Sequence, residues 1–222
     1  MALEIEVHPD AQAVAERGAE LVADVAAEAV AERGRFALAV SGGRTPWAMF
    51  SALYGRMPWE KVTIFQVDER VAPEGDSDRN LTHLERSLPP GGAADVRPLP
   101  VWAEDLDAAA AAYADAMPDR LDLVHLGLGP DGHTASLVPG DPVLDVTDRD
   151  VAVTGEYQGR RRLTLTYAAL NRARRILWLV TGEDKVEALR RLRDGDESIP
   201  AGRVSTENAL VVSDQAAAGS PR

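Results

Sequence analysis

Residues 36–54 read FALAVSGGRTPWAMFSALY, which places an apolar run, two glycines and a helix-forming stretch in direct succession. The first five residues, Phe36 to Val40, are all apolar, as expected of a strand covered on both faces of a parallel sheet. The glycines then allow a tight turn, and a helix is predicted over residues 47–54. This stretch therefore predicts one strand–helix unit of a parallel α/β fold.

Apolar strands and helices alternate in the same way along the rest of the chain. Strands are predicted at residues 62–67, 121–126, 163–166, 176–180 and 209–212, and further helices at residues 7–33, 80–87, 105–116 and 184–193. Asp10 is the expected N-cap of the first helix, and Gly34 is its expected end. The alternation predicts a three-layer, Rossmann-like α/β fold, with a mostly parallel sheet and helices on both faces.

No stretch of the sequence has the composition of a linker between domains. We therefore expect a single domain over residues 1–222. Gly91–Gly92 is expected to lie in a loop, and residues from about 216 onward are expected to form a loosely ordered tail.

Composition narrows the class of protein. The chain has 222 residues and a formal net charge of −12, which argues against a nucleic-acid partner. It has no cysteine, so disulfides, thiolate catalysis and cysteine-bound zinc are excluded, and the cytoplasm is the expected location. Residues 1–10 lack the features of a signal peptide, and no apolar run reaches the roughly 20 residues of a membrane span.

Three polar segments follow predicted strands: residues 41–45, 68–70 and 127–133. In open α/β sheets, ligands bind beyond the carboxyl ends of the strands. Because all three segments occupy that kind of position, we expect them to form one site.

The first segment, Ser41-Gly42-Gly43-Arg44-Thr45, has the composition of a phosphate-binding loop. The glycines let the backbone approach an anion, and the N–H groups that open the next helix point toward it. It is not a Walker loop, because no Lys-Ser/Thr pair follows the glycines. The alternative is a tight strand-to-helix turn in which Thr45 serves as the N-cap.

The segment from Gly127 to His133 reads GLGPDGH and formally fits the dinucleotide pattern G-x-G-x-x-G. That interpretation is disfavoured, because Pro130 removes a backbone donor where a pyrophosphate needs one. Instead, His133 is the candidate general base, since a neutral imidazole can take a proton from water. The alternative is that Asp131 and His133 only cap the next helix. By contrast, His125 lies inside an apolar strand and is expected to be a satisfied core residue.

Cations beside these segments are candidates for binding an anion. The triplet Asp68-Glu69-Arg70 offers a carboxylate to orient a water and a guanidinium for an oxyanion or phosphate, or else it forms a surface ion-pair cluster. The run Arg160-Arg161-Arg162 enters a predicted strand, where it either binds an anion or is a solvated edge. Lys185 opens a helix, and it serves a bound anion or pairs with Glu183 or Asp184.

Other catalytic patterns are missing from the sequence. There is no G-x-S-x-G nucleophile elbow, no H-E-x-x-H and no other cluster with the spacing of metal ligands. We therefore expect a histidine-activated water, with no metal and no cofactor.

Five segments in this order resemble the 6-phosphogluconolactonase family, and the similarity runs from about residue 36 to residue 212. They are VSGGRTP (40–46), VDERVAP (67–73), GLGPDGHTASLVPG (127–140), RRLTLT (161–166) and LVTGEDK (179–185). The resemblance implies the glucosamine-6-phosphate deaminase fold superfamily and hydrolysis of 6-phosphogluconolactone in the oxidative pentose phosphate pathway. It implies a sugar-phosphate substrate, no nucleic acid or membrane as partner, and a monomer or small homo-oligomer.

The resemblance also implies residue roles. His133 is implied as the general base and Asp131 as its support, while Asp68 and Arg70 line the lactone pocket. The implied phosphate site combines the 41–45 loop with two cations, and its residues are Ser41, Gly42, Gly43, Arg44, Thr45, Arg162 and Lys185.

Two other functions stay open at the level of sequence. Glucosamine-6-phosphate deaminases share these segments, but they have a glutamate where this chain has Val138 and a tyrosine or tryptophan where it has Arg70. A non-catalytic sugar-phosphate sensor is the other alternative, although such sensors usually carry an attached binding domain. The chain departs from the usual lactonase pattern at Val138, at Arg79-Asn80 and at Tyr157-Gln158-Gly159-Arg160.

Overall fold

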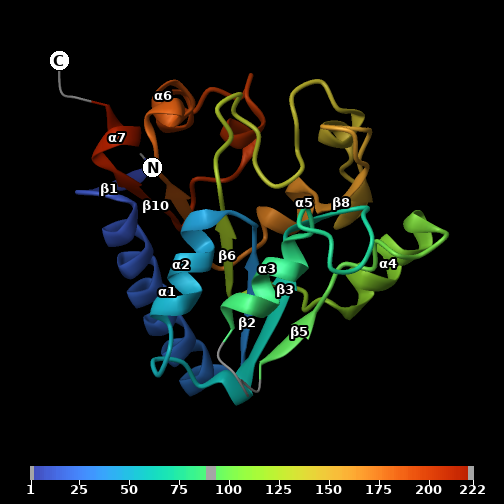
Figure 1. Cartoon of the computed structure of the whole chain (residues 1–222), viewed down its shortest axis with the longest axis horizontal. Coiled ribbons are helices and arrows are strands. Elements are labelled where there is room, and N and C mark those ends of the chain that lie inside the picture. Colours follow the sequence, from blue (N-terminus) through green and yellow to red (C-terminus); the bar gives the residue numbers. More distant parts are fainter. Residues whose placement is uncertain (1–2, 89–93, 220–222) are drawn as a thin grey trace.

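A computed structural model describes residues 3–88 and 94–219 of the chain. Its main element is a seven-stranded sheet in which every strand pair is parallel, as the sequence predicted (Figure 1). In spatial order the strands are β1 (Glu4–His8), β10 (Ala209–Asp214), β9 (Ile176–Val180), β6 (Leu123–Leu126), β2 (Phe36–Val40), β3 (Val62–Gln66) and β5 (Asp95–Arg97).

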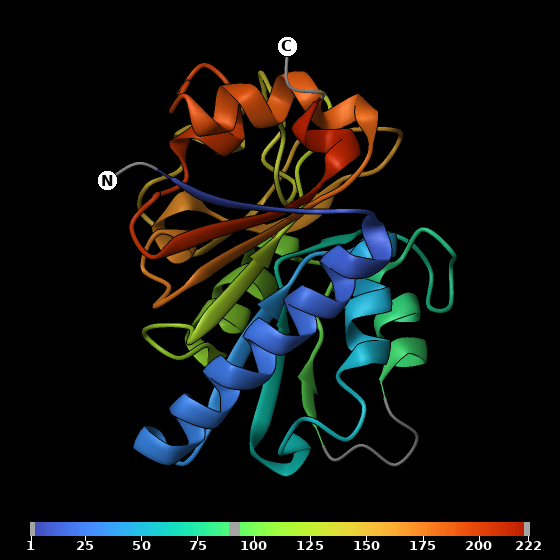
Figure 2. The same cartoon turned by 90° about the vertical axis from the view of Figure 1, so that its left-hand side faces the viewer.

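Helices cover both faces of this sheet. One face carries α1 (Ala11–Arg33), α2 (Arg44–Ala52) and α3 (Asn80–Ser87), and the other carries α4 (Leu106–Ala116), α5 (Tyr167–Leu170), α6 (Val186–Arg193) and α7 (Gln215–Ala218). Short 3₁₀ helices lie at Trp59–Lys61, Pro142–Asp145, Glu183–Lys185 and Pro200–Arg203. Figure 2 shows β1 and β10 running side by side between α1 and the α6–α7 pair.

The apolar run of β2 explains its place inside the sheet. Phe36, Leu38 and Val40 pack in the core cluster beneath α1 and α2, while Ala37 and Ala39 belong to the cluster on the opposite face. Side chains alternate across a strand, so a strand that is covered twice must be apolar at every position. All five residues are buried, which confirms the prediction.

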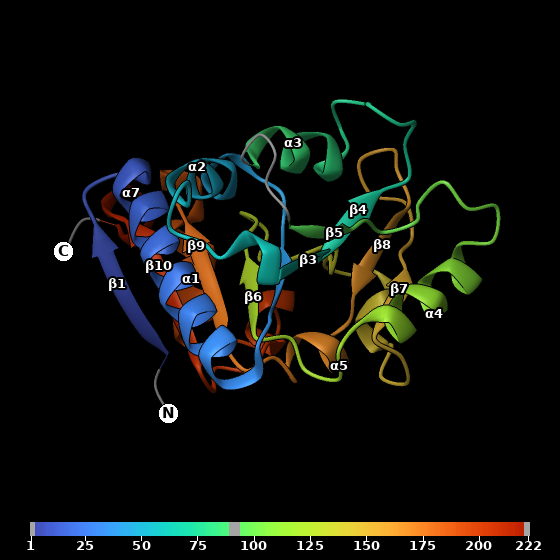
Figure 3. The same cartoon turned by 90° about the horizontal axis from the view of Figure 1, so that it is seen from below.

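A second, smaller sheet packs at one end of the molecule. It is antiparallel and contains β4 (Asp68–Arg70), β8 (Arg162–Leu165) and β7 (Val151–Val153) (Figure 3). Residues 68–70 follow β3 as predicted, but the sequence did not reveal that they form a strand of their own in a second sheet. Val67 marks the change of sheet, because its N–H donates to Val40 of β2 while its carbonyl accepts from Leu165 at the end of β8.

The two ends of the chain also differ from the prediction. The helix expected from Val7 begins only at Ala11, after β1, although Asp10 caps it and Gly34 ends it with a φ of 73° as expected. Residues 215–218 form α7 instead of a loose tail, because the Asp214 carboxylate accepts the N–H of Ala217.

The structure leaves two of the predictions untested. The predicted Gly91–Gly92 loop lies outside the described residues, and the single domain stays a prediction. No helix in the described part of the chain is both long and apolar enough to cross a membrane.

Candidate functional site

A cavity of about 180 Å³ opens beyond the carboxyl ends of β2 and β6. It is lined by Ser41, Gly42, Asp68, Arg70, Asn80, Gly127, Leu128, Gly129, Pro130, His133, Ala135, Arg162 and Lys185. All three polar segments that follow predicted strands therefore meet at one place, as the strand-end rule leads one to expect.

His133 is held by a compact turn after β6. The N–H of Gly129 donates to the carbonyl of His133 at 2.8 Å, and the N–H of Gly132 donates to the carbonyl of Gly129 at 3.0 Å. A Cβ at position 129 would lie 2.0 Å from His133 Nδ1, so only glycine lets the ring take this position. Gly129 thus makes room for the histidine ring, whereas Gly132 lies against Ile199 with a φ of 85°.

Asp131 fixes both the orientation and the tautomer of the His133 ring. Its Oδ1 lies 2.6 Å from His133 Nδ1 and also accepts the backbone N–H of His133 at 3.1 Å. Burial raises the pKa of Asp131, but the backbone hydrogen bond, the charge and the ring of His133 outweigh it and lower that pKa. An ionised carboxylate only accepts hydrogen bonds, so Nδ1 is the donor in this contact and Nε2 is the ring nitrogen left for other chemistry.

Arg162 is a buried cation on β8 that faces the cavity. The residue is 4% exposed, its Nη1 donates to the Ser136 hydroxyl at 3.3 Å, and its Nε has no hydrogen-bond partner among residues 3–88 and 94–219. Burial lowers the pKa of the guanidinium, Asp68 opposes that shift and Arg70 adds to it. A buried donor without an acceptor is costly, so the position suits a bound anion.

Asp68 and Arg70 lie on β4, on the wall beside Arg162. Asp68 accepts the hydroxyl proton of Ser136 at 2.6 Å, and Arg70 donates to Asn80 Oδ1 at 2.7 Å. Asn80 also lines the cavity, although in the sequence it was noted only as part of a departure from the lactonase pattern and not as a site residue. A Cβ on Gly42 would lie 1.9 Å from Asn80 Oδ1, so this amide also explains why position 42 is a glycine.

Glu69, which lies between Asp68 and Arg70 in the sequence, lies outside the cavity lining and holds the start of α3. It is fully buried, and its carboxylate accepts the backbone N–H groups of Asn80 and Leu81, each at 2.8 Å, at the start of α3. Arg79 forms an ion pair with it at 3.2 Å. Glu69 therefore fixes the two segments that carry Arg70 and Asn80 to the cavity.

The predicted phosphate loop is divided between two pockets. Ser41 and Gly42 line the His133 cavity, whereas Arg44 and Thr45 line a neighbouring pocket of about 350 Å³ that also includes Thr181. Gly43 precedes α2 with a φ of 140° and lines neither of them. The division arises because α2 begins at Arg44, three residues before the predicted start, and turns the side chains of its first residues away.

The remaining candidate cations differ in what they contact. Lys185 lines the cavity, and its Nζ also pairs with Asp184 at 2.8 Å, which was one of the two alternatives for it. Arg160 is bound to Asp76 at 3.2 Å and to Asp78 at 3.1 Å, away from the cavity lining.

Tyr157 is a second residue that the sequence analysis did not select. Its ring lies edge-on to that of His133, with a centroid distance of 5.8 Å, and the Arg162 guanidinium lies 5.0 Å from its centre. Tyr157 thus contacts both the candidate base and the buried cation. No pattern in the sequence links the loop at 157 to residue 133, so only the fold reveals this contact.

His125 is buried as expected, but it is not satisfied. In the part of the chain that the structure describes, neither ring nitrogen has a hydrogen-bond partner, and burial lowers the pKa of His125 to about 3. The prediction of a satisfied core histidine was therefore wrong. Among the described residues, no group of three or more His, Cys, Asp or Glu side chains is arranged to hold a metal ion.

Comparison with known proteins gives a consistent set of relatives. Residues 9–212 match a family described as glucosamine-6-phosphate isomerases/6-phosphogluconolactonase. The chain is 37% identical to the 6-phosphogluconolactonase of Mycobacterium tuberculosis over 98% of both chains, and 37% identical to that of Synechocystis over 85% of this chain and 84% of the relative. A crystal structure of a 6-phosphogluconolactonase from Shewanella baltica superimposes with a TM-score of 0.87 at 26% identity, covering 96% of this chain and 97% of that one.

Proposed function

The chain belongs to the family of glucosamine-6-phosphate isomerases and 6-phosphogluconolactonases, and we propose that it hydrolyses 6-phosphogluconolactone with His133 as the general base. The lactonase activity is supported by relatives of that name that are similar over most of their length. The assignment of the base is supported chiefly by one observation, the contact of 2.6 Å between Asp131 and His133 Nδ1 at the cavity.

The chemistry assigned to the base is a proton transfer in two directions. Nε2 of His133 takes a proton from water as the water oxygen bonds to the lactone carbonyl carbon. When the bond from that carbon to the ring oxygen breaks, the protonated imidazole returns the proton to the departing oxygen. Asp131 stabilises the imidazolium between these steps, and general acid–base catalysis of this kind contributes about 10²- to 10⁴-fold.

The cations of the cavity are proposed to stabilise the negative charges of the substrate, which are the developing oxyanion and the phosphate. The carbonyl oxygen becomes an oxyanion on attack, and Arg70 is the proposed donor to it, together with backbone N–H groups. Arg162 and Lys185 are proposed to bind the phosphate, along with Ser41 and the backbone at Gly42. Arg44 and Thr45, which line the neighbouring pocket, and the backbone at Gly43 just before α2 remain proposed contributors to the phosphate site.

Arg162→Ala tests the proposed phosphate site. Because a charge-assisted hydrogen bond is worth about 1.5–3 kcal/mol, the variant is expected to raise KM roughly tenfold or more, with a smaller effect on kcat. Steady-state kinetics on the lactone measures both constants. Arg161→Ala is the matched control, since Arg161 is exposed and lies outside the cavity. An unchanged KM for Arg162→Ala would contradict this assignment.

The valine at position 138 favours lactone hydrolysis over deamination. The resemblance places a proton-transferring glutamate of the deaminases at this position, but Val138 is buried and has no group that titrates. A cytoplasmic location is a further proposal that rests on the cysteine-free sequence. A monomer or small homo-oligomer is proposed on the family resemblance alone.

A coupled assay tests the reaction itself. Glucose-6-phosphate dehydrogenase generates the lactone, and the formation of 6-phosphogluconate is followed with and without the protein. We expect the protein to accelerate hydrolysis well above the spontaneous rate and to release no ammonia from glucosamine 6-phosphate. Ammonia release without lactone hydrolysis would instead assign the chain to the deaminases, and neither activity would favour a sensor.

A further inference from the structure

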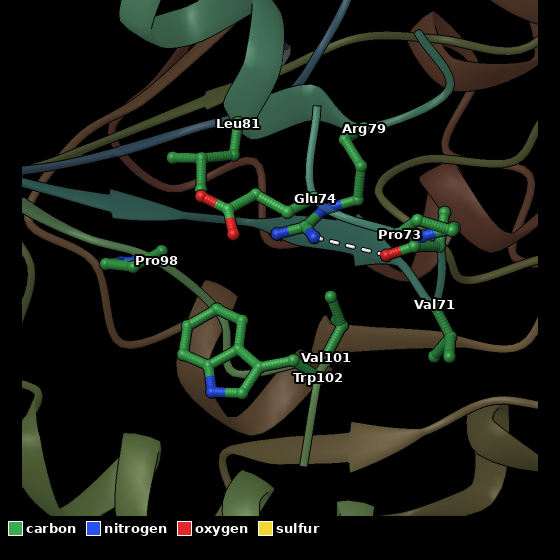
Figure 4. Close-up of a pocket in the computed structure, with 9 residues that line it drawn as sticks. Val71, Pro73, Glu74, Arg79, Leu81, Pro98, Val101 and Trp102 are labelled. Carbon is green, nitrogen blue, oxygen red and sulfur yellow. Dashed lines mark hydrogen bonds between the residues drawn. The ribbon is translucent and has the colours of Figure 1, made fainter. Parts of the chain in front are cut away.

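A second and larger cavity, of about 660 Å³, lies beside the segment that joins β4 to α3. It is lined by Val71, Ala72, Pro73, Glu74, Arg79, Leu81, Pro98, Val101 and Trp102 (Figure 4). The two cavities share no lining residue, although Arg70 and Asn80 line one while their neighbours Val71 and Arg79 line the other. The proposed lactonase site therefore does not account for this cavity.

The lining is apolar except for two groups of opposite charge. Figure 4 shows the side chains of Glu74 and Arg79 on one side of the pocket and the indole ring of Trp102 on the opposite side. A volume of several hundred Å³, an apolar lining and a few polar groups are the usual features of small-molecule sites.

Arg79 is rigidly held and keeps a donor for a ligand. The residue is 3% exposed, its Nε pairs with the buried Glu69, and its Nη1 donates to the carbonyl of Ala72 at 3.2 Å. Within the described part of the chain, its Nη2 forms no hydrogen bond. The guanidinium is thus pre-organised for one more acceptor, such as a carboxylate oxygen.

Glu74 supplies the opposite charge. It lies in the turn that follows β4, where the N–H of Asp76 donates to the carbonyl of Pro73, and the residue is exposed. Among the described residues its carboxylate has no ion-pair partner, whereas the Arg79 guanidinium is paired with Glu69. A ligand that approaches Arg79 with an anion therefore finds an acceptor for a cation on the same side of the pocket.

Trp102 provides the apolar surface. It is 64% exposed, and a turn holds it in place, because the N–H of Val101 donates to Leu99 and that of Ala103 donates to Pro100. An indole ring presented in this way favours a flat apolar group that stacks against it.

From this arrangement we propose that the pocket binds a small zwitterion with a flat apolar body, of the type of an aromatic amino acid. The carboxylate binds Arg79, the ammonium group binds Glu74, and the ring packs between Trp102 and the apolar wall. Each part of such a ligand meets one complementary feature, whereas an anion alone would leave Glu74 unpaired, and a cation alone would leave Arg79 unpaired. The proposal does not depend on the lactonase function.

Isothermal titration calorimetry on the full chain, with L-phenylalanine as the probe, tests whether the pocket binds such a zwitterion. Two analogues each lack one charge: 3-phenylpropionate has no ammonium group, and phenethylamine has no carboxylate. We expect saturable binding of L-phenylalanine, with each analogue about tenfold weaker, which corresponds to the loss of one interaction of about 1.4 kcal/mol. Equal affinity for all three compounds would contradict the zwitterion assignment.

Variants at exposed positions locate the binding. Glu74→Gln is expected to weaken L-phenylalanine about tenfold but to leave 3-phenylpropionate unchanged, and Trp102→Ala is expected to weaken both. Tyr54→Ala is the matched control, because it removes another exposed aromatic ring that is outside the pocket. The proposal is overturned if Trp102→Ala binds as Tyr54→Ala does, or if the wild type shows no saturable heat up to about 10 mM, ten times a millimolar Kd.

Discussion

Two histidines, His125 in β6 and His133 in the loop that follows, lie in opposite surroundings. His125 is fully buried, its ring nitrogens have no hydrogen-bond partner among the described residues, and burial lowers its pKa to about 3. The His133 side chain is 24% exposed, and Asp131 holds its Nδ1 at 2.6 Å. An imidazole therefore becomes a candidate base when it has access to solvent and a carboxylate that orients it. His125 lies close to the same end of β6, but in the described part of the chain it has neither feature.

Truncation of His133 is expected to have the largest effect. His133→Ala should lower kcat for lactone hydrolysis by about 10²- to 10⁴-fold, because general acid–base catalysis is lost, and should change KM little. The control is His125→Leu, which is expected to keep kcat close to the wild-type value. Equal losses in the two variants, measured in the coupled assay, would remove the distinction between the two histidines.

Asp131→Asn sharpens the comparison by removing the feature that His125 lacks. An amide can donate to Nδ1 and stabilise the wrong tautomer, and it cannot balance the imidazolium charge. We expect kcat to fall about a hundredfold, as for a hydrogen bond to a charged group that is worth roughly 3 kcal/mol. If kcat/KM of this variant stays at the wild-type value across the pH range, Asp131 does not position the base.

His125 is expected to make the fold sensitive to acid. Its folded pKa of about 3 lies below the value of about 6.5 for an unfolded histidine, so below pH 6.5 the unfolded chain binds a proton that the folded chain does not. The free energy of unfolding therefore falls as the pH falls from 6.5 toward 3, by about 1.4 kcal/mol per pH unit.

His125→Leu removes this group while it keeps an apolar side chain in the core. Urea unfolding at pH 7 and pH 5 should show the stability of the variant, relative to the wild type, rising by about 2 kcal/mol between the two conditions. If the two proteins lose stability in parallel, His125 is not a neutral buried group.

Tyr157 is expected to have the smallest effect of these residues. Its ring contacts both His133 and Arg162, and contacts of this kind are worth about 0.5–1 kcal/mol at partly exposed sites. Tyr157→Leu should lower kcat/KM about threefold to fivefold. Tyr157→Phe keeps the ring and is expected to match the wild type, so a loss in this variant would instead implicate the phenolic hydroxyl.

Much of the fold could be predicted because the deciding signals are local. β2, β3, β6 and β9 are apolar runs, and α1 has both an N-cap at Asp10 and a terminating glycine at Gly34. The pattern Glu4-Ile5-Glu6-Val7-His8 alternates polar and apolar residues as an edge strand does, and this signal was missed in favour of a longer helix. The change of sheet at Val67 has no local signal, because it depends on hydrogen bonds to Val40 and Leu165.

The candidate site was likewise predictable only in part. The strand-end rule correctly brought parts of all three segments to one cavity, because it depends only on where strands end. These parts are Ser41 and Gly42, Asp68 and Arg70, and residues 127–130 with His133. The rule could not show that Ser41 and Thr45 line different pockets, because that depends on where α2 begins. It also could not identify Asn80 and Tyr157, because their contacts at the site are made between distant segments. Their roles, like those of the other site residues, remain proposals for mutagenesis.

The most direct test of the account is rescue of His133→Ala by free imidazole. If His133 acts as a base through Nε2, imidazole that enters the space left by the ring should restore part of the activity. The rate should rise with imidazole and saturate, above the rate of an enzyme-free sample with the same imidazole. A variant that keeps near-full activity without imidazole, or that stays folded but gains nothing from it, would contradict the assignment of His133 as the general base.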